Sequence, residues 1–553
     1  MSVISRRRFT QGLAALPLLS SGYLKGKTTR RLHLVIDYKS INITGRRVQA
    51  ITVNDSLPGP TLRWQEGDTV DVTVHNRLPV MSAIHWHGLI LPSNMDGVPG
   101  LSFDGIPPGG SYRYRFTLKQ SGTYWYHAHA GFQEQQGVYG AIVINPADRE
   151  AFTADREHIL VLSDWSDEEP QAIFATLKKN AHIYNRNRRT LGDIVSDIKR
   201  QGVARTYRDR EMWNLMRMPD TDLADVSGYT YTYLMNGVTP RDGWLGQFKP
   251  GEEIKLRIIN AAAMSIFDFR IPDLKMRVVG ADGQAVAPIT VDELRLAAGE
   301  TLDVHVTPED DRAYTLFAQS IDRSGFARGT LTPRQGLTAE VPDLDPVPRL
   351  QHIDMGMAPA ATQSGQDHHH HHHHHHHSQP EQPLKHHKSE YGPGVDMHAE
   401  SVSYRLDDPG VGLRNNGRRV LTYADLRRLN GSMSMAEPQR ELELHLTGNM
   451  NRYMWSFNGI RYEDAEPIRW QYGERIRITL VNDTMMIHPI HLHGMWSELE
   501  SGDESALPAK HTIMVQPGSK ISYRVSADAR GNWAYHCHNL YHMMGMFREV
   551  IVT

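Results

Sequence analysis

The feature that most constrains the fold is a segment that occurs three times along the chain. The first copy, VNDSLPGPTLRWQEGDTVDVTVHN, ends at Asn76, the second ends at Asn260 and the third ends at Asn482. Each copy begins at an Asn-Gly or Asn-Asp turn, passes a Gly-acid turn and enters a strand that alternates apolar and polar residues. Such alternation predicts antiparallel strands with one buried and one solvated face. The sequence therefore predicts three related β-sandwich domains in a mainly β protein.

Two segments interrupt this pattern. Residues 166–227 have helical spacing and few β-branched residues, so we expect a small helical insertion in the second domain. Residues 351–400 are rich in Pro, Gly, Gln and His without periodicity, so we expect a disordered linker there. The predicted domains are therefore residues 31–148, 149–350 and 401–553.

The first 30 residues have the pattern of an export signal. The basic sequence SRRRF, at residues 5–9, precedes a short and weakly apolar run over residues 12–22. An arginine pair before such a run is typical of a twin-arginine signal, so we expect export to the periplasm. No stretch reaches the roughly 20 apolar residues of a spanning helix, so we expect no membrane span. A net charge of −3 gives no electrostatic reason to expect nucleic acid as a partner.

The repeats also align four His-x-His pairs. They lie at matching positions of the first and third copies and comprise His85 and His87, His127 and His129, His491 and His493, and His536 and His538. The middle copy has Phe269, Ile271, Phe317 and Gln319 instead. Residues i and i+2 of a strand point to the same side, so each pair presents two imidazoles to one face. If the two domains face each other, eight imidazoles meet, which suits several copper ions rather than one zinc ion.

Cys537 is the only cysteine among the 553 residues, and it lies between His536 and His538. Strand alternation turns its side chain away from those two imidazoles, where we expect it to meet His488 and His542. Two imidazoles and a thiolate with a nearby methionine form the ligand set of a blue-copper electron-transfer site. The backbone would then join this sulfur atom directly to histidines that hold the other copper ions.

The motifs HWHG, HAH, HPIHLHG and HCHNLYHMMGM resemble those of the multicopper oxidases. LTGNMNRYMWSFNG, YTYLMNG and HMMGMFREV resemble the periplasmic copper-resistance protein A group of that family. The resemblance implies three cupredoxin-like Greek-key β-sandwich domains and four copper ions. It implies a type 1 copper on His488, Cys537 and His542, and a type 2 copper on His85 and His491. The implied ligands of a type 3 copper pair are His87, His127, His129, His493, His536 and His538.

Two further site residues follow from the same resemblance. Asp96, in NMDGVPG, matches an acid that relays protons in relatives, and it could equally be a turn residue before Gly97. The family places its axial ligand ten residues after the cysteine, whereas Met546 lies nine residues after Cys537. Either Met546 reaches the copper through a tighter turn, or Met544 replaces it, or the axial position is weakly filled. Such a change should tune the redox potential more than it weakens copper binding.

The expected function is copper tolerance in the periplasm, through oxidation of Cu(I) to Cu(II) coupled to the four-electron reduction of dioxygen to water. A laccase-like phenol oxidase and a copper-sequestering protein with little oxidase activity are the alternatives. Several methionines are expected near the blue-copper site, namely Met485, Met486, Met495, Met543 and Met544. They favour a soft Cu(I) donor, and the alternative is that they fill the core. The expected partners are dioxygen, Cu(I) or a phenolic donor, and a periplasmic copper carrier.

The predicted linker contains ten consecutive histidines at residues 368–377. Clustered neutral imidazoles bind copper readily, so we expect a copper-capturing loop, with a plain flexible linker as the alternative. An expression tag is disfavoured because the run lies in the middle of the chain. Nickel and zinc bind imidazoles too, so the run cannot by itself select copper.

Overall fold

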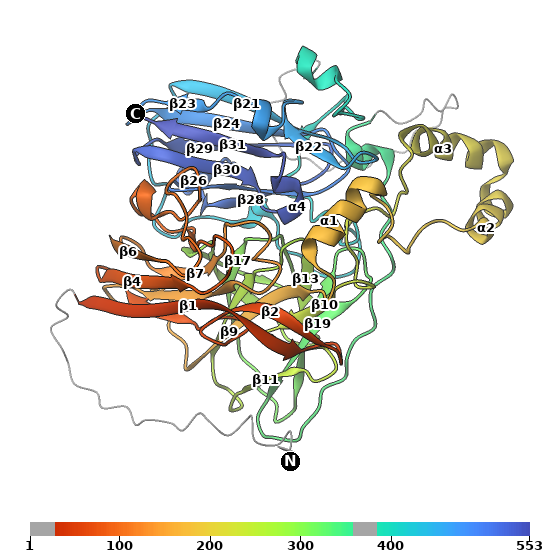
Figure 1. Cartoon of the computed structure of the whole chain (residues 1–553). Helices are drawn as coiled ribbons and strands as arrows, with labels where there is room; N and C mark the ends of the chain where they lie inside the picture. Colours follow the sequence, from red (N-terminus) through yellow and green to blue (C-terminus); the bar gives the residue numbers. More distant parts are fainter. Residues whose placement is uncertain (1–27, 358–383) are drawn as a thin grey trace.

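The computed structural model describes residues 28–357 and 384–553. Most of the predicted export signal and the run of ten histidines lie outside the described residues. The described chain forms six sheets that pair into three sandwiches, as Figure 1 shows in orange, green and blue. Within the described part, none of the helices combines the length and apolar character needed to cross a bilayer.

The first sandwich contains two four-stranded sheets. One has the order β2-β1-β4-β6, with β1 Thr29–Asn42, β2 Arg47–Val53, β4 Thr69–Asn76 and β6 Ser111–Thr117. The other has the order β3-β8-β7-β5, with β3 Leu62–Gln65, β5 His85–His87, β7 Gly122–His127 and β8 Tyr139–Asn145. Alternate residues of β4, such as Val70, Val72 and Val74, are fully buried between these sheets.

The second sandwich contains a six-stranded and a five-stranded sheet. Its six-stranded sheet, β10-β9-β12-β17-β14-β15, comprises β9 Arg156–Trp165, β10 Thr232–Met235, β12 Ile254–Asn260, β14 Met276–Ala281, β15 Gln284–Val291 and β17 Thr301–Val306. Its five-stranded sheet, β11-β19-β18-β13-β16, comprises β11 Trp244–Gln247, β13 Phe267–Arg270, β16 Glu293–Leu296, β18 Tyr314–Ser320 and β19 Phe326–Thr332.

The third sandwich repeats this plan. Its first sheet has the order β22-β21-β24-β29-β26-β27, with β20 beside β29, and comprises β20 Ser403–Tyr404, β21 Arg440–Asn449, β22 Met454–Phe457, β24 Arg475–Asn482, β26 Ser497–Leu499, β27 Ala509–Lys510 and β29 Ser519–Ser526. Its second sheet, β23-β31-β30-β25-β28, comprises β23 Ile468–Trp470, β25 His488–Leu492, β28 Thr512–Val515, β30 Gly531–Cys537 and β31 Phe547–Val552. The short helix α4 Leu540–Met543 follows β30.

The repeated strand occupies the same place in every sandwich. It is β4, β12 or β24, and it pairs antiparallel with β6, β17 or β29. On its other side it runs parallel to β1, β9 or β21. The expectation of antiparallel strands is therefore wrong on that side. Alternation reports which face of a strand is buried, but strand direction depends on the long connections that bring each domain's first strand beside the repeat.

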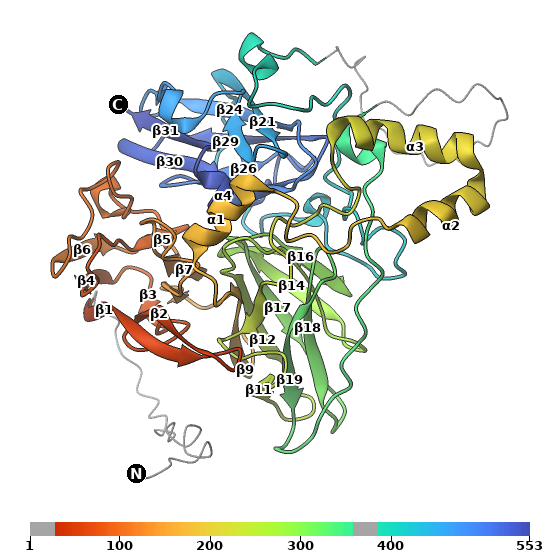
Figure 2. The same cartoon turned by 45° about the vertical axis from the view of Figure 1, so that its right-hand side comes forward.

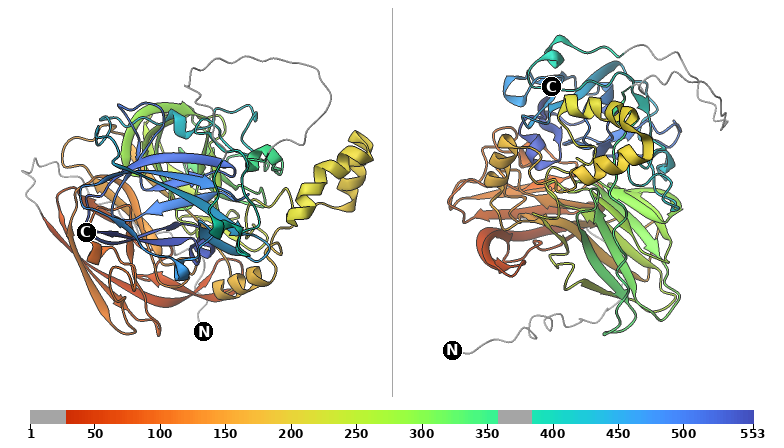
Figure 3. Two further views of the ribbon diagram at one scale, coloured as in Figure 1. Left: turned by 90° about the horizontal axis from the view of Figure 1, so that it is seen from above. Right: turned by 90° about the vertical axis from the view of Figure 1, so that its right-hand side faces the viewer.

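The segment expected as a helical insertion contains α1 Pro170–Lys179, α2 Leu191–Gln201 and α3 Val203–Met216. Helix α1 begins with a proline, ends in two lysines and buries Ile173 and Leu177. Helix α2 begins at a capping box formed by Thr190 and Asp193. Helices α2 and α3 project away from the sandwiches, whereas α1 lies against the third one (Figures 2 and 3).

The two described ends of the expected linker are ordered rather than disordered. Short 3-10 helices form at His352–Met355 and Lys388–Tyr391. Met355, Glu390, Met397 and Ala399 are buried. The burial of these side chains explains why the segment is ordered. The sequence did not predict it, because composition alone does not show that a few apolar residues pack into the neighbouring core.

Candidate metal centre

The His-x-His pairs of the first and third sandwiches occupy equivalent strands. In the first sandwich β5 pairs with β7, which places His85 opposite His127. In the third sandwich β25 pairs with β30, which places His491 opposite His536. The second members of the later pairs lie just beyond their strands: His129 is two residues after the end of β7 and His538 is one residue after the end of β30. Each sandwich therefore presents four imidazoles at one end of a sheet.

The imidazoles of the two sandwiches form several overlapping triads, and two of these, the mixed triads, consist entirely of the implied type 3 ligands. One contains His87, His127 and His538, and the other contains His129, His493 and His536. Within each triad the candidate ligand atoms lie within 4.8 Å of one another. In the second triad, His536 Nε2 lies 3.3 Å from His129 Nε2 and 3.0 Å from His493 Nε2. The remaining two rings, His85 and His491, have centroids 5.7 Å apart.

Several ring nitrogens have an arrangement that suits metal binding. His85 Nδ1 donates to the Asp96 carbonyl at 2.7 Å, and His491 Nδ1 donates to the His511 carbonyl at 2.7 Å. Such a bond sets the tautomer and leaves a lone pair on Nε2. Among the described residues, His85 Nε2, His491 Nε2 and His127 Nε2 are buried without a hydrogen-bond partner. A buried nitrogen without a partner is costly, so these residues fit a metal cluster.

Burial also favours the neutral form of four of the clustered imidazoles. It lowers the pKa of His87, His127, His491 and His493 well below the usual value, and neighbouring imidazoles lower it further. Neutral imidazole is the form that binds a metal ion.

Cys537 lies beside the two predicted histidines on the opposite side of β30. Its Sγ is 3.5 Å from His488 Nδ1 and 3.8 Å from His542 Nδ1, and these two nitrogens are 3.2 Å apart. All three side chains are fully buried. Burial raises the pKa of the Cys537 thiol, so the thiolate requires a cation at this position.

The two candidate axial methionines differ in exposure. Met546 is fully buried, and its carbonyl accepts a hydrogen bond from the Cys537 amide at 3.0 Å. Met544 is 45% exposed. The amide of Met546 donates to the carbonyl of His542 at 2.9 Å, which closes a tight turn after α4. The turn that accommodates the shorter spacing therefore holds Met546, and not Met544, in the core beside the cysteine strand.

Asp96 contacts two of the predicted ligands and also occupies a turn. Its Oδ2 lies 2.8 Å from His493 Nδ1, and its carbonyl bonds His85. Gly97 follows with φ 88°, and a Cβ there would lie 1.9 Å from the Ile84 carbonyl oxygen. The carboxylate thus bridges the first and third sandwiches at the edge of the imidazole cluster.

Three residues around these clusters escaped the sequence analysis. Glu134 Oε2 lies 2.7 Å from His127 Nδ1, and Asp225 Oδ2 lies 2.6 Å from His542 Nε2. His511 is buried with its ring centroid 4.8 Å from that of His87. None of the three belongs to a His-x-His pair or to the repeat, so the repeat gave no signal for them.

The helical insertion covers the cysteine site. Asp225 comes from its end, is buried, and accepts a hydrogen bond from the Tyr453 hydroxyl at 2.8 Å. Phe174 of α1 stacks on Tyr541 of α4 with ring centroids 5.8 Å apart, and Figure 2 shows the two helices side by side. His542 consequently has no exposed surface.

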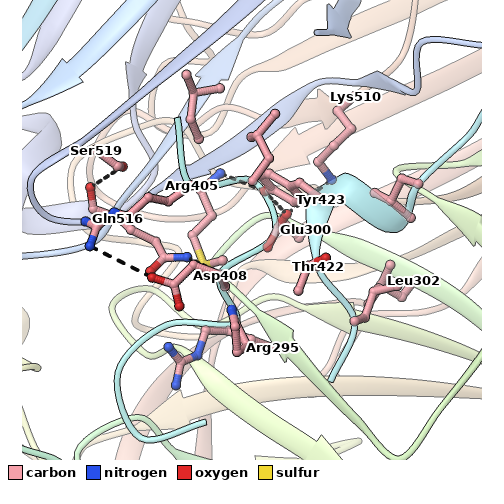
Figure 4. Close-up of a pocket in the computed structure, with 16 residues that line it drawn as sticks. Arg295, Glu300, Leu302, Arg405, Asp408, Thr422, Tyr423, Lys510, Gln516 and Ser519 are labelled. Atoms are coloured by element: carbon pink, nitrogen blue, oxygen red, sulfur yellow. Dashed lines mark hydrogen bonds and ion pairs between the residues drawn. The ribbon is translucent and has the colours of Figure 1, made fainter. Parts of the chain in front are cut away.

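A separate polar pocket lies between the second and third sandwiches (Figure 4). Lys510 Nζ lies 2.9 Å from Asp282 and 3.1 Å from Glu300, and the Tyr423 hydroxyl donates to Glu300 at 2.6 Å. None of the predicted metal ligands lines this pocket. Its buried charges form ion pairs between the second and third sandwiches.

Comparisons with known proteins agree with this geometry. Three family models, each described as multicopper oxidase, match residues 35–149, 156–336 and 436–553. A copper resistance protein A homolog of Pseudomonas syringae pv. tomato is 54% identical over 99% of both chains. Copper resistance protein A of Escherichia coli is 54% identical over 94% of this chain and 92% of its own.

Solved structures show the same fold. Fet3p, a multicopper oxidase that functions in iron import, superposes with a TM-score of 0.65 at 19% identity, covering 95% of this chain and 90% of its own. A multi-copper oxidase from Pseudomonas thermotolerans gives a TM-score of 0.59 at 19% identity, covering 96% of this chain and 100% of its own. The likeness extends across all three sandwiches.

Proposed function

The chain belongs to the multicopper oxidases, in the group of copper resistance protein A, and from this premise we propose that it oxidises Cu(I) to Cu(II) in the periplasm. It is an oxidoreductase that uses dioxygen, and its family role is copper resistance. The proposal adds the donor, the compartment and the placement of four copper ions.

The copper ions would be held as follows. Cys537, His488 and His542 would bind a type 1 copper, with Met546 as the buried axial residue. His85 and His491 would bind a type 2 copper through Nε2, the nitrogen that lacks a partner. The two mixed triads would bind the type 3 pair, with three imidazoles for each ion. Bound copper supplies one-electron chemistry for the reduction of dioxygen to water.

The chain itself supplies a short connection between the two sites. Cys537 is bonded through the backbone to His536 and His538, which belong to different triads. In addition, His536 Nδ1 donates to the Cys537 carbonyl at 2.9 Å. Reduction of dioxygen consumes protons, and Asp96 Oδ2, at 2.8 Å from His493 Nδ1, is placed to hold a proton at the cluster edge.

The cover over His542 is the observation that favours Cu(I) over a phenol. A flat aromatic donor cannot contact the His542 ring, because Asp225 bonds its outer nitrogen and the insertion covers it. The Asp225 carboxylate attracts a small cation, and its Oδ2 already accepts hydrogen bonds from the Tyr453 hydroxyl and the His542 ring, which leaves that oxygen engaged toward a phenol. The laccase-like alternative is therefore less well supported.

The neighbouring methionines give weaker support. Met485, Met486 and Met495 are buried and pack in the core. Met543 is partly buried and Met544 is 45% exposed, so these two remain available to a soft Cu(I) donor.

Oxygen uptake by copper-loaded protein tests the donor. We expect rapid uptake with Cu(I) and slow uptake with a phenol. Asp225→Asn should lower kcat/KM for Cu(I) about 10–100-fold with the blue absorption retained, because the carboxylate lies outside the copper ligands. Asp222→Asn is the matched control, since Asp222 is a buried acid of the same segment that bonds His182 instead. Faster uptake with the phenol would favour the laccase-like oxidase, and no uptake with either donor would favour sequestration.

The compartment and the histidine run are tested separately. Replacing Arg6 and Arg7 by lysine should leave the protein in the cytoplasm if the twin-arginine route is used.

Deleting residues 368–377 should weaken recruitment of copper at low concentration, or its transfer from a periplasmic carrier, while oxidation of a phenol is unchanged. Unchanged copper recruitment would reduce the run to a plain linker.

A further inference from the structure

A second group of histidines and carboxylates lies on the third sandwich, outside the copper sites. His445, on β21, and Asp483, directly after β24, come from neighbouring parallel strands. The 3-10 helix Lys388–Tyr391 places Glu390 against these two residues. His386 lies four residues before Glu390 in the sequence. Glu390 is 1% exposed, Asp483 0% and His445 4%.

Four ligand atoms of this group face one another. His445 Nδ1 lies 2.6 Å from Asp483 Oδ2 and 3.5 Å from Glu390 Oε2. His386 Nδ1 lies 2.8 Å from the same Glu390 oxygen and 3.7 Å from the same Asp483 oxygen. In a tetrahedral site with bonds of about 2.1 Å, ligand atoms are about 3.4 Å apart. Two of the four separations have this size already, and the two short ones need to widen by about 0.6–0.8 Å.

The outer nitrogens of both imidazoles are bonded in the manner of metal ligands. His386 Nε2 donates to the Ala399 carbonyl at 3.2 Å, and His445 Nε2 donates to the Glu443 carboxylate at 3.3 Å. These bonds leave Nδ1 of each ring facing the group. Without a metal, His445 Nδ1 donates to Asp483, and, despite its burial, the hydrogen bonds to Asp483 and Glu443 raise the pKa of His445 to about 10. The other oxygen of Asp483 accepts from the Ala399 amide at 3.0 Å, which orients that carboxylate as well.

We propose that His386, Glu390, His445 and Asp483 bind one divalent transition-metal ion, Zn(II) or Cu(II), separate from the four copper ions of the oxidase. Two neutral imidazoles and two carboxylates balance the charge of such an ion, and Zn(II) takes imidazole nitrogen and carboxylate oxygen as ligands in four-coordinate tetrahedral sites. Without a metal, the two carboxylates and the two imidazoles form a buried ion-pair network. The ion would fasten the end of the linker to the third sandwich.

Other contacts of the linker end agree with this role. The Ser389 hydroxyl donates to the Asn458 carbonyl at 2.7 Å, and the Asp396 amide donates to the Gly448 carbonyl at 3.0 Å. The linker end is therefore already seated along β21 and β22, and the ion adds a cross-link to a preformed surface.

Anomalous scattering from crystals of the full chain, grown with Zn(II) or Cu(II) in separate arms, tests the proposal by position. We expect a peak among the four ligand atoms in at least one arm. Because the readout is spatial, ions bound by residues 368–377 or by the oxidase site do not interfere. Absence of a peak in both arms means an ion-pair network only and overturns the proposal.

Metal content gives an independent test. In copper-loaded protein that lacks residues 368–377 and is then incubated with Zn(II) or with further Cu(II), Glu390→Gln and Asp483→Asn should each retain one metal ion fewer per chain after gel filtration in at least one arm. His305→Gln is the matched control, because His305 is a buried histidine paired with Glu253 in another domain. Zn(II) should also raise the Tm of the parent chain but not that of Glu390→Gln. Equal retention of both metals in all variants would contradict the site.

Discussion

At the scale of single residues, Asp96 has the most distinctive position, because one carboxylate spans imidazoles of two domains. We expect Asp96→Asn to lower turnover about 10–100-fold, because an amide cannot hold and release the proton and orients the rings less well. The blue absorption should be unchanged, since Asp96 bonds His85 and His493, which are not ligands of the Cys537 site. Oxygen uptake and the visible spectrum of copper-loaded protein check both parts, and full activity would remove Asp96 from the proton path.

Met546 and Met544 provide a matched pair for the axial position. Loss of a weak thioether donor disfavours Cu(II), so Met546→Leu should raise the reduction potential of the blue site while copper remains bound. Met544→Leu should leave the potential unchanged, because Met544 is half-exposed. Redox titration of the blue absorption distinguishes them, and a shift confined to Met544→Leu would reverse the assignment.

At the scale of elements, the loop after β5 depends on one glycine. In Gly97→Ala the new Cβ would meet the Ile84 carbonyl in a left-handed backbone conformation, so we expect a loss of about 1–3 kcal/mol in unfolding free energy. Gly100→Ala is the control in the same loop: its φ is 76° but nothing lies within 4 Å of the added carbon. Thermal unfolding compares them, and equal losses would show that crowding at Gly97 has no effect.

The elements also show how far sequence reasoning reaches. Strand alternation and the repeat located the four histidine pairs and put Cys537 on the opposite face, because both depend only on the two-residue period of a strand. Parallel pairing of β1 with β4 was not predictable, since it depends on connections distant in sequence. Asp225 escaped for the same reason, because it reaches its partners from an insertion whose local pattern carries no information about its destination.

At the scale of the whole molecule, buried charges connect the sandwiches. Lys510, on β27, neutralises Asp282 and Glu300 of the second sandwich, and all three are buried. Lys510→Met would leave two carboxylates together without a cation, so we expect a loss of about 3–5 kcal/mol in stability. The exposed Lys119→Met is the control. Calorimetry of both variants checks this, and an unchanged Tm for Lys510→Met would contradict the role of the pair.

The central claim is that the first and third sandwiches share one imidazole cluster next to the Cys537 site. The most direct measurement is an anomalous difference map, recorded at the copper edge, from crystals of copper-loaded protein. We expect three peaks between the two sandwiches, one at each mixed triad and one at His85 with His491. We expect a fourth peak beside Cys537, His488 and His542. Copper confined to other parts of the chain, with no peak between the sandwiches, would contradict it.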